Sequence, residues 1–243
     1  MKKAIFFAIV ALLSFSSCKL DNGGYPIPNN GNVLLWRKVS NNIGQVDIYT
    51  RFFICADAVL YMDENTQNLV KQLWFNNYDI TLEDGKVVFV EKNNKYSQVK
   101  YTVVTDGKKL SEGGVWRVDL DNIATTTKHT LAEVTGAVGK EGVYIHPIKE
   151  ESYEENRDFV TTVGYNINIE EQKVYFTYDS RGEINCKRNT YNIKFRTDAI
   201  YPLTIISDGY YMSGRVHIEY KDNITNKERK TTVVYQDGER DFI

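Results

Sequence analysis

The stretch Tyr78–Phe89 reads YDITLEDGKVVF and indicates two strands joined by a tight turn. Apolar and polar residues alternate before the Asp84-Gly85 pair, and a mainly apolar run follows it. An alternation of period two places successive side chains on opposite faces of a strand. Asp-Gly between such runs favours a hairpin, because glycine tolerates the positive φ that two-residue turns require. The stretch therefore predicts an antiparallel hairpin.

The same pattern recurs along the chain. In Tyr191–Arg196 and again in Arg215–Tyr220, apolar and polar residues alternate. Two stretches remain open: Gln45–Met62 is either a buried helix or two core strands, and Lys128–Val138 is compatible with a short helix. We predict a mainly β fold of antiparallel sandwich or barrel-like units with little helix. Further turn signals occur at Asp106-Gly107, Arg181-Gly182, Asp208-Gly209 and Asp237-Gly238.

Three short motifs recur in the same order, which favours a tandem duplication over convergence among strands. The modules would span 33–113 and 114–243, the second ending in an extra hairpin of Arg215–Lys221 with Lys230–Gln236. Residues alike in both copies are interpreted as core anchors: Trp36 with Trp116, and Phe89 with Phe176. The paired motifs are Trp36-Arg37 and Asn42-Ile43 with Trp116-Arg117 and Asn122-Ile123, Tyr78–Phe89 with Tyr165–Phe176, and Asp106–Ser111 with Asp208–Ser213.

The N-terminus has the pattern of an export signal. Lys2 and Lys3 precede the apolar run Ala4–Leu13, which is shorter than the roughly 20 residues that span a bilayer. The Phe15–Cys18 stretch, FSSC, resembles a bacterial lipoprotein lipobox, with phenylalanine where leucine is usual. The alternative is a plain secretory signal followed by an ordinary cysteine.

The resemblance implies that residues 1–17 are removed and that Cys18 carries the lipid that holds the protein on a membrane. Stretch 19–22, KLDN, resembles in part the segment that follows the cysteine in surface-exported lipoproteins of Bacteroidetes. We therefore expect an outer-membrane location, with the cell surface and the periplasmic face both open. Residues 18–32, rich in Gly, Pro and Asn, are interpreted as a flexible linker.

Composition excludes some classes of function. The 243 residues carry 30 basic and 32 acidic side chains, and loss of Lys2 and Lys3 makes the mature chain more acidic. A chain without a basic excess is not expected to bind nucleic acid. After Cys18 two cysteines remain, Cys55 in an apolar run and Cys186 in a polar one. An oxidising compartment permits a bridge between them, but their unlike settings favour two free thiols.

No motif points to catalysis. His129, His146 and His217 are too far apart in sequence for a zinc-ligand spacing, and no serine-hydrolase elbow or phosphate loop is present. Asp119-x-Asp121-Asn122 lacks the other ligands of a calcium loop and is interpreted as a solvated turn. We expect no metal, no cofactor and no enzyme activity, with a hydrolase using paired acids as the least favoured alternative.

The remaining candidates are aromatic. Trp74, Tyr210 and Tyr211 are weak ligand-binding candidates, since exposed Trp and Tyr combine an apolar face with a polar edge. For Trp74 a position in the core is the competing interpretation. We expect a lipid-anchored, non-catalytic binding or adhesion protein of the cell envelope, with a glycan or a protein as ligand. The alternative is a structural subunit that docks to an envelope complex.

Overall fold

The computed structural model describes residues 33–92, 99–122, 127–134, 143–147, 160–186, 189–206, 211–236 and 239–242. Within these ranges two helices precede the strands, and the strands pair antiparallel throughout. The mainly β prediction is confirmed. The elements are α2 (Val33–Tyr61), α3 (Glu64–Trp74), β1 (Tyr78–Glu83), β2 (Lys86–Glu91), β3 (Val99–Thr105), the short 3-10 helix η1 (Leu110–Glu112), β4 (Trp116–Asn122), β5 (Thr127–Val134), β6 (Val143–Pro147), β7 (Val160–Asn168), β8 (Lys173–Cys186), β9 (Asn189–Thr197), β10 (Leu203–Ile206), β11 (Tyr211–Asp222), β12 (Glu228–Gln236) and β13 (Glu239–Phe242).

The open stretch Gln45–Met62 is a helix, and it belongs to the 29-residue α2. Seven consecutive residues from Phe52 to Ala58 are buried, so side chains leave the helix axis into the core in every direction. Asp63 caps α3 by accepting a hydrogen bond from the backbone N–H of Thr66 at 3.0 Å. Residues 33–74 are thus mostly helical, and the strands of the first predicted module begin only at Tyr78.

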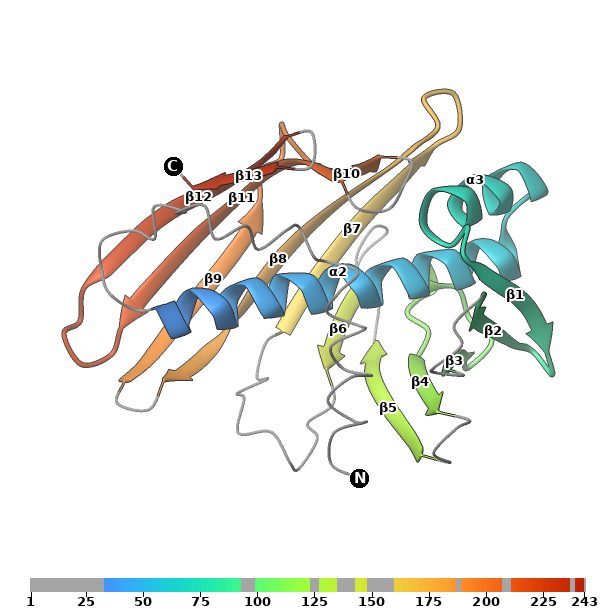
Figure 1. The fold of residues 1–243 in the computed structure, drawn as a ribbon, viewed down its shortest axis with the longest axis horizontal. Coiled ribbons are helices and arrows are strands. Elements are labelled where there is room, and N and C mark those ends of the chain that lie inside the picture. Colours follow the sequence, from blue (N-terminus) through green and yellow to red (C-terminus); the bar gives the residue numbers. More distant parts are fainter. Residues whose placement is uncertain are drawn as a thin grey trace.

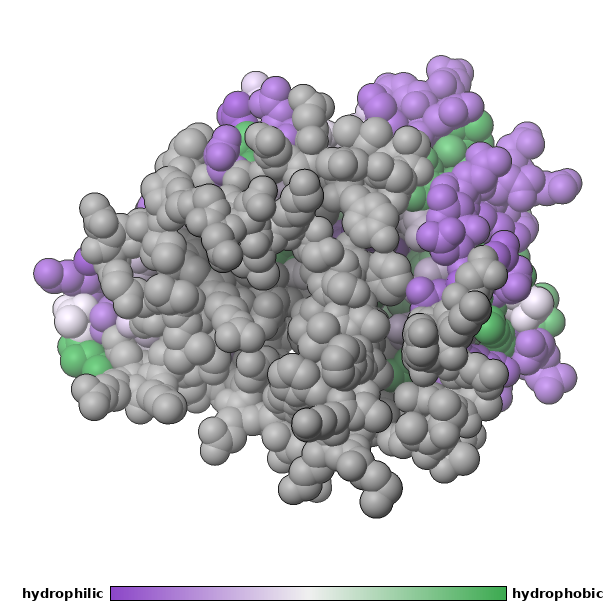
Figure 2. All heavy atoms as spheres, in the orientation of Figure 1, coloured by the Kyte–Doolittle hydropathy of each residue, from purple (hydrophilic) through white to green (hydrophobic). Residues whose placement is uncertain are grey.

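The Tyr78–Phe89 hairpin forms as predicted. Glu83 pairs with Lys86, and the two turn residues between them, Asp84 and Gly85, have φ values of 49° and 74°. Positive φ at both central positions defines the turn whose twist matches that of the flanking strands. In the orientation of Figure 1, Figure 2 shows hydrophilic side chains gathered over the end of the molecule that carries α3 and β1.

The strands form one hydrogen-bonded sheet of 13 strands across the described residues. Two groups, β1–β4 and β7–β12, are joined through β5 and β6, and β3 pairs with β4 across the predicted module boundary at 113. The open stretch Lys128–Val138 is strand β5 as far as Val134. The turn predicted at Arg181-Gly182 is wrong: Gly182 pairs with Ile193 in the middle of β8. Asp208-Gly209 and Asp237-Gly238 lie outside the described residues.

The helix α2 lies across one face of this sheet and contacts strands of both groups (Figure 1). Phe52 is the centre of an aromatic cluster, with its ring centroid 4.7 Å from that of Tyr101 and 5.0 Å from that of Phe89. Phe75 lies 5.1 Å from Phe52 in the same cluster. The predicted anchors Phe89 and Phe176 are both buried. The core therefore consists of α2 together with the sheet side chains that point toward it.

Trp116, the other predicted anchor that the structure describes in full, is completely buried. Its indole Nε1 donates to the carbonyl oxygen of Lys108 at 2.8 Å. A Cβ at Gly114 would lie 2.7 Å from both of these atoms, so only glycine fits beside this bond. Trp36 lies on α2, and its side chain is outside the described set.

One of the three paired motifs forms the same kind of element in both predicted copies. Tyr78–Phe89 and Tyr165–Phe176 both form antiparallel hairpins. Trp36 lies on a helix whereas Trp116 lies on a strand, and the residues from Leu110 form a 3-10 helix where the second copy has a strand. The duplication stays a prediction that rests on the hairpin. The predicted C-terminal hairpin is present as β11 paired with β12.

A buried carboxylate connects α2 to the sheet. Asp57 accepts a hydrogen bond from the hydroxyl of Tyr165 at 2.8 Å and another from the backbone N–H of Leu110 at 3.2 Å. These contacts span 108 and 53 residues of sequence. Burial raises the pKa of Asp57, and the two hydrogen bonds oppose that rise only in part.

Replacing Asp57 by alanine leaves the Tyr165 hydroxyl and the Leu110 N–H without their acceptor. We expect Asp57→Ala to lower the free energy of unfolding by about 2–4 kcal/mol, and Asp57→Asn, which keeps an acceptor oxygen, by less than half as much. Urea unfolding measures both. Equal losses for the two variants would contradict the role of the acceptor.

The parent protein and Asp57→Asn should also differ in how their stability depends on pH. Because the pKa of Asp57 is higher in the folded than in the unfolded chain, its contribution to stability is greatest below about pH 4 and is lost as the pH rises through the folded-state pKa. The stability of Asp57→Asn relative to the parent should therefore increase between pH 4 and pH 7.

Candidate functional site

Trp74 is a core residue and not a surface ligand contact. It ends α3, its side chain is only 7% exposed, and its ring packs edge-on against that of Phe176 at 6.3 Å. The amphipathic pattern of α3 turns Leu73 and Trp74 inward together with Leu69 and Val70. Trp74 is therefore not a surface ligand contact, and the competing interpretation, a position in the core, holds.

The other sequence candidates are not brought into a site by the described structure. Tyr211 begins β11, opposite Ile206 of β10, and its side chain is outside the described set. Tyr210 and Cys18 lie outside the described residues. The thiol of Cys55 is free and buried on α2, which agrees with the favoured interpretation that it does not pair with Cys186.

The alternation of His217 with charged residues suggests a solvated side chain. In the structure the ring instead has two hydrogen-bonding partners. Its Nε2 lies 3.0 Å from Asp198 Oδ2, and its Nδ1 lies 3.0 Å from the hydroxyl of Thr232. A carboxylate only accepts, so Nε2 carries the proton that it donates to Asp198. His217 therefore ties the turn after β9 to strands β11 and β12. His129 and His146 lie on β5 and β6, and their side chains are outside the described set.

Asp119 and Asp121 lie on strand β4 and not in a solvated turn. Arg117, Asp119 and Asp121 are two residues apart, so they share the sheet face that points away from α2. The inward-facing Val118 and Leu120 are buried in the core. The pairing of β4 with β5 shifts register between Val118 and Asp119, and such an irregularity increases the local twist.

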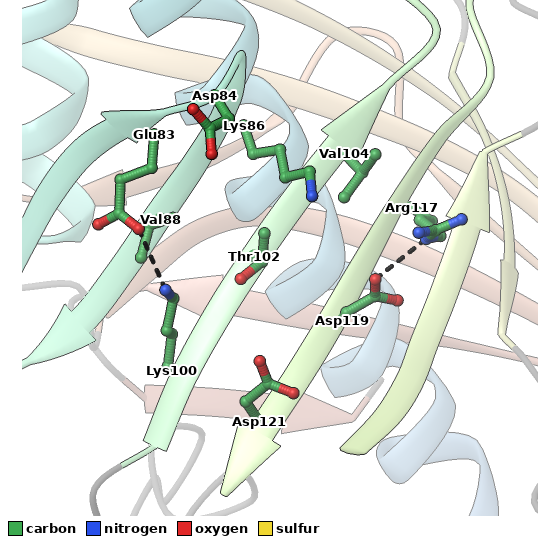
Figure 3. A pocket seen from close by; sticks show the side chains of 10 residues that line it. All are labelled: Glu83, Asp84, Lys86, Val88, Lys100, Thr102, Val104, Arg117, Asp119 and Asp121. Atoms are coloured by element: carbon green, nitrogen blue, oxygen red, sulfur yellow. Dashed lines mark hydrogen bonds and ion pairs between the residues drawn. The ribbon is translucent and has the colours of Figure 1, made fainter. Parts of the chain in front are cut away.

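These residues line a shallow hollow of about 430 Å³ on the outer face of β1–β4. In Figure 3 the side chains stand on the near face of the strands, and α2 passes behind them. Val88, Thr102 and Val104 form its floor between charged walls. The complete lining is Glu83, Asp84, Lys86, Val88, Lys100, Thr102, Val104, Arg117, Asp119 and Asp121.

Two ion pairs border the hollow on opposite sides. Lys100 Nζ lies 3.2 Å from Glu83 Oε2, and Arg117 Nε lies 3.0 Å from Asp119 Oδ2 (Figure 3). Glu83 also accepts a hydrogen bond from the hydroxyl of Thr81, and both contacts lower the pKa of Glu83. Each pair neutralises one cation and one carboxylate, so the hollow has no strong excess of either sign.

Two side chains of the hollow have hydrogen-bonding capacity that no described residue uses. Asp119 Oδ1 is buried and has no hydrogen-bond partner among the described residues. Lys86 makes no ion pair within the described part of the chain, and its side chain extends over the hollow (Figure 3). The hollow thus offers the ammonium of Lys86 and the partly exposed carboxylate of Asp119 above an uncharged floor. Within the described ranges, no group of three or more His, Cys, Asp or Glu side chains is placed to hold a metal ion.

Sequence reasoning missed this site because it treated Asp119 and Asp121 as a turn. The available signal was the charge alternation Arg117, Asp119, Asp121, which has the period of a strand.

The described helices include none that is long and apolar enough to cross a membrane. Comparison with family models, with curated proteins and with solved structures finds no significant match.

The ion pairs of the hollow are solvent-exposed, with the side chain of Arg117 50% and that of Asp119 26% exposed. Such pairs contribute little to stability. We therefore expect Asp119→Ala to change the free energy of unfolding by less than about 1 kcal/mol in a urea titration, in contrast to Asp57→Ala. A loss of 2 kcal/mol or more would assign Asp119 a structural role.

Proposed function

We propose that this chain is a lipid-anchored, non-catalytic binding protein of the outer membrane and that the hollow on β1–β4 binds a glycan. The observation that carries the proposal is a hollow in which Lys86 makes no ion pair among the described residues and the carboxylate of Asp119 is 26% exposed, so both side chains can bond a ligand. A sugar hydroxyl both donates and accepts, so the hydroxyls of a sugar can bond an ammonium as well as a carboxylate.

The balance of charge supports a neutral ligand. Three cations and four carboxylates line the hollow, and two of each are already paired with one another. A polyanion would meet four carboxylates, and a polycation would meet three positive side chains. The methyl groups of Val88, Thr102 and Val104 suit the C–H face of a sugar ring. The lining contains no aromatic ring, so we expect weak binding, with a dissociation constant of about 10 μM to 1 mM.

A glycan array tests the assignment, and the glycans retained by the parent protein are then titrated against variants. Asp119→Ala and Lys86→Ala should each weaken binding about tenfold or more, since each removes one direct hydrogen bond to the ligand. The matched control is Asp79→Ala, which removes a carboxylate of β1 that is outside the lining and 69% exposed. Retention of no glycan, or equal effects of Asp79→Ala and Asp119→Ala, would refute the proposal.

The anchor is tested separately through Cys18. We expect the mature protein to begin at a lipid-modified Cys18, visible as an increased mass of the N-terminal peptide, and Cys18→Ala to move the protein from the membrane to the soluble fraction. Protease treatment of intact cells then locates the body. Cleavage indicates that the hollow meets external glycans, and protection until lysis indicates the periplasm. Membrane retention of Cys18→Ala would overturn the lipoprotein assignment.

One feature favours the second candidate, a subunit that docks to an envelope complex. Strand β1 ends the sheet order, and its Leu82 side chain is 58% exposed. The outer edge of a terminal strand presents backbone groups that can pair with a strand of a partner. Specific crosslinking from Leu82 to an envelope protein would favour docking over glycan capture.

A further inference from the structure

The turn between β9 and β10 displays two large apolar side chains. Ile200 is 79% exposed and Tyr201 is 47% exposed, and Ile200 is the most exposed large hydrophobic residue of the described chain. We call these two residues the Ile200–Tyr201 tip. Exposed hydrophobic side chains on a turn are informative when the turn is held in one conformation, because a rigid element loses little entropy on binding.

The backbone of the tip is hydrogen-bonded within the protein. Asp198 Oδ1 accepts from the N–H of Ile200 at 2.8 Å and from that of Tyr201 at 3.3 Å. The N–H of Arg215 donates to the carbonyl of Tyr201 at 3.0 Å, and the N–H of Asp198 donates to the carbonyl of Arg215 at 2.9 Å. The tip can therefore enter an apolar medium without leaving these N–H groups unpaired.

Side chains hold the tip from behind. The guanidinium of Arg215 lies 4.0 Å from the ring centroid of Tyr201, and His217 Nε2 bonds to Asp198 Oδ2. Gly214 has φ 131°, and a Cβ there would lie 2.5 Å from the carbonyl oxygen of Pro202, so β11 packs directly against the end of the turn. The tip is thus preorganised from three directions.

From this arrangement we propose that the tip contacts the headgroup–acyl boundary of a phospholipid bilayer. In an apolar medium, unpaired backbone N–H groups are costly, and the backbone N–H groups of Ile200 and Tyr201 are already bonded. Tyrosine is suited to the membrane–water boundary, and arginine bonds phosphate through two N–H groups at once. The aliphatic Ile200, the amphipathic Tyr201 and the guanidinium of Arg215 match acyl chain, boundary and phosphate in order.

This contact is distinct from the lipid on Cys18 and from the hollow. A single lipid modification on a linker leaves the body free to rotate, whereas a second contact fixes which side faces the bilayer. Membrane attachment is strongest when two such signals act together.

The test uses the mature chain 18–243 with Cys18→Ala, which has no attached lipid. Flotation with vesicles of phosphatidylethanolamine and phosphatidylglycerol measures its partition coefficient. We expect measurable binding that falls about tenfold when Ile200→Ser and Tyr201→Ser are combined. Circular dichroism and the Tm should stay unchanged, since both side chains are exposed.

The control is Ile224→Ser. Ile224 is 70% exposed in a comparable turn, where Asp222 Oδ1 accepts from its N–H at 2.9 Å. Ile224→Ser should keep the partition coefficient within twofold. Absence of vesicle binding by the parent would overturn the proposal and leave the tip to a protein partner. An equal loss for Ile224→Ser would also overturn it, since the binding would then reflect general hydrophobicity.

Discussion

Burial of the middle of α2 on all sides is the constraint on which the rest of the structure depends. Between Phe52 and Ala58 no side chain of the helix faces solvent, and this segment even includes the carboxylate of Asp57. A flat sheet covers only one side of a helix. The rest of its cover includes α3, which packs against α2, while α2 contacts strands of both groups, β1–β4 and β7–β12. Asp57 joins the two groups, because Tyr165 lies on β7 and Leu110 lies between β3 and β4.

Because α2 occupies the inner face of the sheet, the side chains of that face form the core and the outer face carries the charged ones. Along each strand, successive side chains point alternately to the inner and to the outer face of the sheet. On β4, Val118 and Leu120 pack inward, while Arg117, Asp119 and Asp121 line the hollow. The stability of the fold and the chemistry of the surface therefore lie on opposite sides of the same backbone. Substitutions in the hollow can therefore change the surface while the core stays intact.

The parts of the fold that were predictable from sequence are those determined by near neighbours. The hairpin at Asp84-Gly85 and the alternation of Tyr191–Arg196 depend on local backbone preferences, and both are present. The type of element in Gln45–Met62 was not predictable, because a helix buried all round shows no polar face and hence no period. Gly182 was misread because a glycine inside a long strand has the same appearance as a turn residue.

The candidate site was less predictable than the fold for a related reason. The hollow exists only where side chains of four strands meet, and the ion pair of Lys100 with Glu83 spans 17 residues of sequence. The partner of His217 is Asp198, 19 residues earlier and in a turn. Trp74 illustrates the opposite error, since its aromatic character suggested a surface role that the inward face of α3 excludes. Pairings of this kind follow from the register of the sheet and not from the local pattern.

The position of α2 ahead of every strand has a consequence for how the chain reaches its final form. Synthesis proceeds from the N-terminus, so α2 emerges before the described strands that cover it. Contacts such as that between Asp57 and Tyr165, 108 residues apart, close late, and chains dominated by such distant contacts fold slowly. Until β7 and β8 arrive, the apolar surface of the helix has no partner and is exposed to aggregation. A shortened chain that ends before β7 would thus retain α2 without the strands that cover it.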